Sequence, residues 1–261
     1  MSAVLDISHH FKSQFQKELT FVLSRGGLGE LVPYMQPKVN LQTREVVEYE
    51  ALLRWLRPGS PSPSDVATIA TEIGMADRLW EIILRSTCEI MVTLPKEMLR
   101  PVSVNICASQ LKSAHFLVEN AVSIVKSFGV SPSLIEFEIT EHLPIENLIY
   151  AARIVEKFRN EGFKVSLDDF SNGYSTLTML RDMPISGIKI DNAFLSSPRS
   201  EKLAVSIIDF CHSNGISVVI EGVETEDQHR QANRMEVDLG QGFLYARPFD
   251  IRSLCHTNLQ N

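Results

Sequence analysis

Three short apolar segments in the second half of the chain end in charged side chains: FKVSLDD at 163–169, GIKID at 187–191 and ISVVIEG at 216–222. Their length and their content of valine and isoleucine predict β-strands. Segments with helical spacing of apolar residues, at about 175–182 and 200–213, separate the three strands. Strands that alternate with helices in this way predict a parallel α/β sheet.

The same alternation extends in both directions from this region. Further strands are predicted at Tyr34–Asn40, 45–54, 102–106, 134–139 and 242–246. Further helices are predicted at 8–25, 64–73, 76–95, 114–128, 145–160 and 225–235. Eight strands within about 230 residues predict a closed (β/α)8 barrel of the TIM type. An open doubly wound sheet is the alternative, but it normally has a glycine-rich phosphate turn after its first strand, and QPKVN at 36–40 is not one.

The composition is that of an acidic globular protein. The chain has 261 residues, of which 44 % are hydrophobic and 22 % charged, and its net charge is −7. Such a chain does not bind nucleic acid through a broad basic face. The four cysteines are far apart and lack zinc-site spacing, which predicts reduced thiols and a cytoplasmic location. We expect no signal peptide, because the N-terminus lacks a basic region followed by an apolar core, and no membrane binding, because no apolar run reaches the ~18 residues of a membrane span.

Polar side chains lie at or near the ends of the predicted strands. They are Glu50, Asn105, Glu138, Asp168, Asp169, Lys189, Glu221 and Gln241. The carboxyl ends of barrel strands meet on one face, where barrel enzymes keep their chemistry. Five of these residues are acids, and acids brought together repel one another unless hard cations lie between them. The pattern therefore predicts a magnesium- or manganese-type site of oxygen ligands.

Each of these positions also has a simpler interpretation. Adjacent carboxylates at Asp168 and Asp169 can hold two cations that clamp a phosphate, but aspartate is also common in exposed turns. Glu50 can bind a metal ion and Arg54 a phosphate, or the two side chains can form a buried salt bridge. Lys189 can orient a water molecule, or it can pair with Asp191.

At these residues the chain resembles the EAL-domain family, the cyclic di-GMP phosphodiesterases of bacterial second-messenger signalling. The resemblance covers 16–251, and its motifs occur in order. They are Gln36-Pro37, Glu50-Ala51-Leu52-Leu53-Arg54, Asn105, Glu138, Glu141, Asp168-Asp169-Phe170, Lys189-Ile190-Asp191, Glu221-Gly222-Val223-Glu224 and Gln241-Gly242. We accordingly expect an N-terminal extension at 1–15, the EAL barrel domain at 16–255 and a C-terminal tail at 256–261.

The resemblance implies a modified (β/α)8 barrel whose first strand is antiparallel to the others. It implies two Mg²⁺ or Mn²⁺ ions per active site, held by Glu50, Asn105, Glu138, Asp168, Asp169 and Glu221. Lys189 would position the attacking water, and Glu221 would be the base. The residues implied to contact the substrate are Gln36, Arg54, Asp191, Gln241 and Pro248. Glu141 would anchor the loop after Asp169.

The activity implied is hydrolysis of one phosphodiester bond of cyclic di-GMP, which gives linear pGpG. A homodimer and a regulatory domain or partner protein are also implied. Ser171 and Asn172 depart from the family pattern in the loop after the two aspartates. That departure motivates a second hypothesis, a catalytically weak or inactive receptor for cyclic di-GMP or for a protein partner. An unrelated barrel hydrolase is a third.

Overall fold

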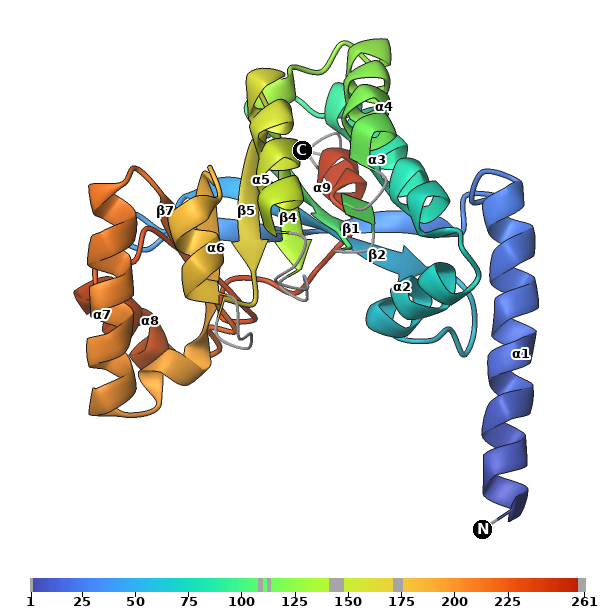
Figure 1. The fold of residues 1–261 in the computed structure, drawn as a ribbon, viewed down its shortest axis with the longest axis horizontal. Coiled ribbons are helices and arrows are strands. Elements are labelled where there is room, and N and C mark those ends of the chain that lie inside the picture. Colours follow the sequence, from blue (N-terminus) through green and yellow to red (C-terminus); the bar gives the residue numbers. More distant parts are fainter. Residues whose placement is uncertain (1, 108–109, 112–113, 141–147, 171–175, 258–261) are drawn as a thin grey trace.

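Eight strands hydrogen-bond in chain order and close into a barrel in this computed structural model (Figure 1). The structure describes residues 2–107, 110–111, 114–140, 148–170 and 176–257. The strands are β1 (Leu31–Asn40), β2 (Val46–Trp55), β3 (Val102–Ile106), β4 (Ile135–Thr140), β5 (Lys164–Asp168), β6 (Gly187–Asp191), β7 (Ser217–Glu221) and β8 (Leu239–Gln241). The predicted closed barrel is therefore confirmed.

Strand β1 runs antiparallel to both of its neighbours, β2 and β8, whereas the other neighbouring strands pair in parallel. The cause is the tight turn between β1 and β2. The side-chain oxygen of Asn40 accepts hydrogen bonds from the backbone N–H groups of Gln42 and Thr43, and Arg44 has a positive φ of 60°. A turn this short forces an antiparallel pair. The predicted antiparallel first strand is thus confirmed.

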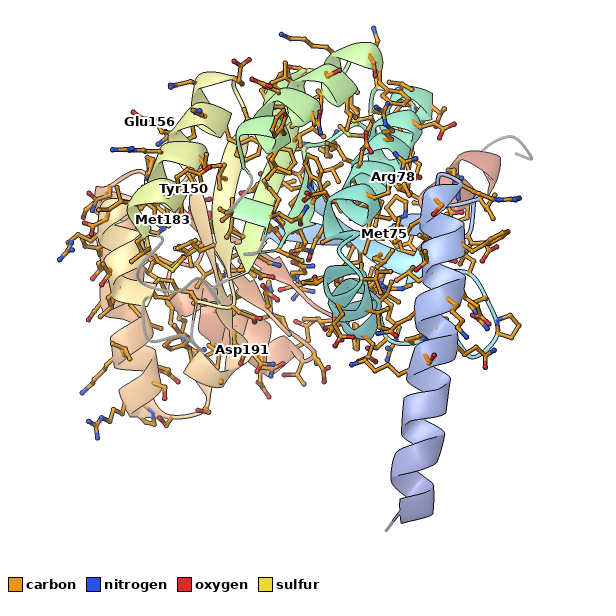
Figure 2. All side chains as sticks on the ribbon, turned by 45° about the vertical axis from the view of Figure 1, so that its right-hand side comes forward. Met75, Arg78, Tyr150, Glu156, Met183 and Asp191 are labelled. Atoms are coloured by element: carbon orange, nitrogen blue, oxygen red, sulfur yellow. The ribbon has the colours of Figure 1, made fainter. Side chains whose placement is uncertain are left out.

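Helices surround the barrel and follow most of the predicted ranges. They are α1 (Ser2–Ser24), α2 (Pro63–Glu72), α3 (Ala76–Thr93), α4 (Ala114–Ser127), α5 (Leu148–Asn160), α6 (Thr176–Asp182), α7 (Pro198–Ser213), α8 (Glu226–Arg234) and α9 (Arg252–Thr257), with 3-10 turns η2 (Pro132–Leu134) and η4 (Asn192–Leu195). Helix α1 stands at the edge of the molecule, and its N-terminal part extends past the other elements (Figures 1 and 2). No helix of the described residues is long and apolar enough to cross a bilayer.

In the C-terminal part of the chain, the structure corrects one predicted strand and adds one helix. The predicted strand at 242–246 is wrong, because the last strand is β8 and the chain turns directly after it. A side chain at Gly242 would lie 2.1 Å from the carbonyl oxygen of Val223, and Gly242 accepts backbone hydrogen bonds from Tyr245 and Ala246. The apolar side chains of this segment therefore belong to a turn. Helix α9 was not predicted.

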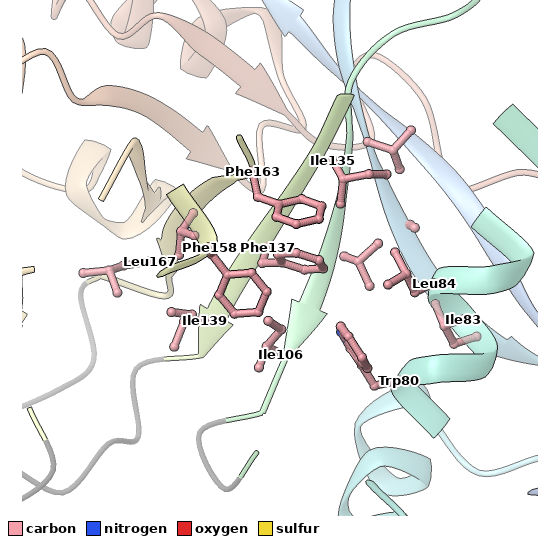
Figure 3. Packing of buried hydrophobic residues seen from close by; sticks show 14 of the residues in the cluster. Trp80, Ile83, Leu84, Ile106, Ile135, Phe137, Ile139, Phe158, Phe163 and Leu167 are labelled. Atoms are coloured by element: carbon pink, nitrogen blue, oxygen red, sulfur yellow. The ribbon is translucent and has the colours of Figure 1, made fainter. Parts of the chain in front are cut away.

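The outer face of the barrel wall packs against the helices through apolar side chains (Figure 3). Phe137 of β4 is fully buried, and its ring centroid lies 4.7 Å from Phe158 of α5, 5.1 Å from Phe163 and 5.8 Å from Trp80 of α3. Side chains alternate between the two faces of a strand, so the neighbours of Phe137 in β4 point the other way. This layer is an ordinary hydrophobic core.

The inner face of the wall is polar instead. Lys38 of β1 contacts Glu138 of β4, and Lys189 of β6 contacts Glu50 of β2. Because these strands are not neighbours, such contacts cross the lumen of the barrel. Branched apolar side chains usually fill the interior of a (β/α)8 barrel, so a charged lumen is a departure that needs a reason. The predicted domain boundaries stay predictions, although α1 runs without interruption across residues 15 and 16.

Candidate functional site

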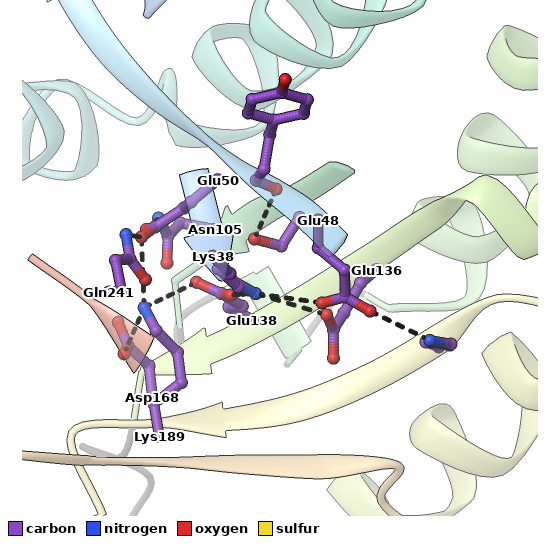
Figure 4. Close-up of polar contacts among 12 residues, drawn as sticks. Lys38, Glu48, Glu50, Asn105, Glu136, Glu138, Asp168, Lys189 and Gln241 are labelled. Carbon is purple, nitrogen blue, oxygen red and sulfur yellow. Dashed lines mark hydrogen bonds and ion pairs between the residues drawn. The ribbon is translucent and has the colours of Figure 1, made fainter. Parts of the chain in front are cut away.

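The ammonium group of Lys189 lies among four carboxylates, and Figure 4 shows three of them, those of Glu50, Glu138 and Asp168. Its Nζ is 3.2 Å from Glu50 Oε2, 3.0 Å from Glu138 Oε2, 3.0 Å from Asp168 Oδ1 and 2.9 Å from Glu221 Oε1. These acids come from β2, β4, β5 and β7, which are spread along 172 positions of the sequence, from 50 to 221. The barrel therefore brings together the acids that the sequence placed in separate strands.

Glu50 does not end its strand, contrary to the pattern expected from the sequence. It lies in the middle of β2, because the hairpin with β1 makes both strands ten residues long. Two amide groups hold its carboxylate: Asn105 Nδ2 donates to Oε1 at 2.8 Å, and Gln241 Nε2 donates to Oε2 at 2.6 Å. Gln241 Nε2 also lies 3.1 Å from Gln36 Oε1. Gln36, Glu50, Asn105 and Gln241 thus form one connected group.

The two adjacent aspartates adopt different backbone conformations. Asp168 is the last residue of β5, whereas Asp169 has a left-handed φ of 52°, which is uncommon for a residue other than glycine. The backbone N–H of Asp169 donates to Asp168 Oδ1 at 3.1 Å, and that of Phe170 donates to the carbonyl of Lys189 at 3.0 Å. Such strain commonly occurs at functional sites. Both aspartates are among the residues that line the cavity described below.

The site carries more negative than positive charge, and the pKa values show how the protein responds. Burial, together with the nearby Asp168, raises the pKa of Glu221 to about 9, and the attraction of Lys189 does not offset this. Burial and repulsion by Glu138 also raise the pKa of Glu50. Burial alone would raise the pKa of Glu138, but Lys189 and Lys38 together lower it. A proton on Glu221 therefore relieves part of the charge that bound cations would neutralise.

A cavity of about 490 Å³ opens above these side chains. The predicted site residues that line it are Gln36, Glu50, Asn105, Asp168, Asp169, Lys189, Glu221 and Gln241. Glu138 is fully buried beneath it, in contact with Lys189. On the side of α2 and α3 the wall is apolar and includes Ala67, Leu79 and Trp80. The cavity therefore joins an acidic floor to an apolar flank.

The other predicted site residues lie apart from this group. Arg54 donates to the carbonyl of Leu53 and lies over the ring of Tyr34, at 5.7 Å from its centroid. Asp191 caps the turn η4, where its carboxylate accepts the N–H of Ala193 at 2.7 Å. Within the described part of the chain, Arg54, Asp191 and Pro248 are not among the residues that line the cavity.

Two further expectations fall outside the described residues. They are the loop-anchoring Glu141 and the departure at Ser171 and Asn172.

Comparison with known protein families finds a match along most of the chain. The sequence pattern of the EAL domain family matches residues 23–248. This chain belongs to the EAL domain family. The resemblance predicted from the motifs is thus confirmed, and so is the barrel with its antiparallel first strand.

Several known proteins share this EAL domain. The chain is 34 % identical over 234 residues to "Cyclic di-GMP phosphodiesterase NbdA" of Pseudomonas aeruginosa, covering 86 % of this chain and 30 % of that protein. It is 32 % identical to "Cyclic di-GMP phosphodiesterase RocR" of the same organism, covering 84 % of this chain and 58 % of that protein. The solved structure "PaMucR Phosphodiesterase, c-di-GMP complex" has a TM-score of 0.81 at 28 % identity, covering 91 % of this chain and 99 % of that one. The chain therefore spans only part of the two named relatives.

The donor set of this EAL domain fits divalent cations, although its side chains now contact one another. Asn105 Oδ1, Gln241 Oε1 and Glu221 Oε1 are buried and accept no hydrogen bond within the described residues, and Glu221 Oε1 lies near Lys189 without hydrogen-bonding alignment. All three are oxygen atoms, which Mg²⁺ and Mn²⁺ prefer. No three His, Cys, Asp or Glu side chains of the described ranges have ready cation spacing. Holding a cation would therefore exchange part of the ion pairs with Lys189 for coordination.

Three charged residues next to the site were not expected from the sequence. Lys38 Nζ lies 2.7 Å from Glu138 Oε1, 3.5 Å from Glu136 Oε2 and 3.7 Å from Glu48 Oε2, and it is 1 % exposed. A signal for them exists in the sequence. Lys38, Glu48 and Glu136 each lie two positions from an expected site residue, and a strand points such residues to the same face.

Proposed function

We propose that this EAL domain is a metal-dependent phosphodiesterase that hydrolyses one phosphodiester bond of cyclic di-GMP to give linear pGpG. The observation that carries the proposal is the convergence of four carboxylates within 3.2 Å of the ammonium of Lys189. Membership of the EAL family and the names of the curated relatives support the substrate.

Two Mg²⁺ or Mn²⁺ ions would be held by oxygen atoms of the lumen. Glu50, Asn105, Glu138 and Asp168 would hold the first ion, and Asp168 with Asp169 and Glu221 the second. When bound, such ions lower the pKa of water and stabilise negative charge that develops on a phosphate. The paired arrangement is supported by the cavity lining, which includes both Asp168 and Asp169.

Lys189 and Glu221 would act on the water molecule that attacks the phosphate. Burial alone would lower the pKa of Lys189, but its four carboxylate neighbours raise it well above its ordinary value. The ammonium therefore stays protonated and serves as a hydrogen-bond donor that orients the water and not as a base. Glu221 lies on the cavity wall and is the carboxylate that would accept the proton of the water, once cation binding has released the proton that it holds in the cation-free protein.

The dinucleotide would lie across the rim of the barrel. Gln36 and Gln241 already present amide groups at the cavity, and Arg54, Asp191 and Pro248 would contact more distant parts of the substrate. Because the floor of the cavity is acidic, a phosphodiester would enter only together with cations that offset this charge.

The direct test is chromatography of a mixture of protein, cyclic di-GMP and Mg²⁺. We expect linear pGpG with the unmodified protein and none with Glu50→Ala. The matched control is Glu156→Ala, an exposed glutamate on α5, which should leave turnover unchanged. A protein that neither binds nor hydrolyses cyclic di-GMP would contradict the proposal.

A second candidate is a receptor that binds cyclic di-GMP with little turnover. The departure from the family pattern at Ser171 and Asn172 favours it. In the same experiment, binding of the intact cyclic dinucleotide without linear product would support the receptor.

We also propose that the protein acts as a cytoplasmic homodimer, with a regulatory domain or partner protein controlling it. Cys88, Cys107 and Cys211 are free thiols, as is usual in a reducing compartment. Exposed apolar side chains at the starts of α5 and α6, among them Ile149 and Leu177, support a protein contact there. Sedimentation at several protein concentrations would test the dimer.

A further inference from the structure

We propose that Lys38 is a positioning residue that holds one oxygen of Glu138 so that the other oxygen serves the cation site. The inference rests on the proposed function, because it assigns Glu138 to a cation. It adds a residue from the antiparallel strand β1 to the machinery of the lumen.

The contacts of Glu138 carry the inference. Its Oε1 lies 2.7 Å from Lys38 Nζ, and its Oε2 lies 3.0 Å from Lys189 Nζ. A different lysine therefore engages each oxygen, and the side chain of Glu138 is fully buried between them. A carboxylate held at both oxygens cannot rotate freely. With Lys38 on one side, only the oxygen toward Lys189 faces the other acids of the site.

Lys38 is itself fixed from below, on the side away from the cavity. Its ammonium lies within 3.7 Å of Glu136 and Glu48, and Glu48 in turn contacts Lys164 at 3.1 Å. These residues lie nearer the N-terminal ends of their parallel strands than Glu138 and Asp168 do. Lys38, Glu48 and Lys164 therefore form a row of alternating charges that ends at the partly exposed Lys164. This row holds Lys38 in place and does not contact the cavity.

A purely structural role for Lys38 gives a different expectation. Buried ion pairs often add little net stability, since desolvation of both charges offsets their attraction. If Lys38 served only to neutralise charge, a variant that removes Lys38 together with one of its acids would behave like the unmodified protein. If Lys38 positions Glu138, the same variant would still lose affinity for the cation, because residues that orient metal ligands typically contribute 10- to 100-fold in affinity.

The experiment measures Mn²⁺ affinity by titration calorimetry, in the absence of nucleotide, together with thermal unfolding. The variants are Lys38→Met and the charge-balanced double variant Lys38→Met with Glu136→Gln. Lys164→Met is the matched control, because it removes a lysine of the same row that contacts Glu48 and is half exposed. We expect Mn²⁺ affinity to fall about 10- to 100-fold in both Lys38 variants and less than about 2-fold in Lys164→Met.

Each result has one meaning. Unchanged Mn²⁺ affinity in a folded Lys38 variant, single or double, would overturn the positioning role. The double variant keeps the test available if the single variant does not fold, because it leaves no extra uncompensated charge. Failure of the unmodified protein to bind Mn²⁺ would instead overturn the proposed function. Equal losses in Lys164→Met and Lys38→Met would show a general charge effect and also overturn the inference.

Discussion

The two faces of the barrel wall differ in polarity and in what they contribute to the protein. The outer face buries Phe137 against Phe158 and Trp80, with no charge involved. The inner face connects acids and lysines through ion pairs. They are Glu48, Glu50, Glu136, Glu138, Asp168, Glu221, Lys38, Lys164 and Lys189. An apolar lumen would stabilise the fold at least as well. A function in catalysis or binding therefore explains the charged lumen better than stability does. The apolar outer layer supplies the stability that the fold needs to keep these charges buried.

The largest effect that separates the two faces is expected when one inner-face charge is removed and the shape of its side chain is kept. Asp168→Asn should reduce hydrolysis of cyclic di-GMP by at least about 100-fold, because loss of groups that merely orient metal ligands already costs 10- to 100-fold. The measurement is the rate of pGpG formation. Asp182→Asn makes the same change at an exposed residue of α6 and should have no effect. Normal turnover by folded Asp168→Asn would contradict the division of roles.

The reverse test removes bulk from the outer face. Phe158→Ala should lower the free energy of unfolding by about 3–5 kcal/mol, because it opens a cavity among Phe137 and Phe163. The affinity of the folded protein for Mn²⁺ should stay within about 2-fold, because its lumen keeps every charge. Denaturant unfolding and calorimetry would measure the two quantities. A large loss of affinity in the folded variant would show that the two faces are coupled.

A third test uses pH to examine the charge excess of the lumen. Between pH 4.5 and about 9, Glu221 holds a proton in the folded state that the unfolded chain releases. Because the folded state binds more protons in this window, the contribution of Glu221 to stability must fall as pH rises. In the presence of chelator, the free energy of unfolding should therefore decrease as pH rises. It should decrease less in Glu221→Gln. An identical pH dependence for both proteins would contradict a protonated Glu221.

The smallest effect is expected at an isolated polar group of the outer layer. The hydroxyl of Thr87 on α3 is fully buried and has no hydrogen-bond partner among the described residues. Thr87→Val keeps the shape and removes this hydroxyl, so it should stabilise the protein by up to about 1 kcal/mol. Thermal unfolding would detect the change. A clear destabilisation would mean that the hydroxyl has a partner and that polar groups of the outer face are also in use.

The sequence predicted the elements of the barrel better than the positions of its side chains. Strand–helix alternation and the acids near the strand ends indicated the closed barrel, and most boundaries differ by one to three residues. The segment 242–246 was misread because its apolar residues look like a strand, whereas the close approach of Gly242 to Val223 depends on tertiary structure.

The site was predictable as a set of residues but not as a network. Spacing indicated Glu50, Asn105, Glu138, Asp168 and Glu221, each on its own strand. The role of Lys38 depends on the closure of the barrel. Strands β1 and β4 are not neighbours, so no strand pairing that could be read from the sequence brings Lys38 to Glu138. The interactions of Arg54 with Tyr34 and of Asp191 with the turn η4 were likewise hidden, because both are local contacts that depend on side-chain orientation.

The most direct test of a cation-binding lumen is diffraction from crystals of the protein soaked in Mn²⁺, recorded so that manganese gives an anomalous signal. We predict anomalous peaks among Glu50, Asn105, Glu138 and Asp168, with a second peak beside Asp169 and Glu221. Mn²⁺ found only at surface carboxylates, with Lys189 still holding all four acids of the lumen, would contradict the account.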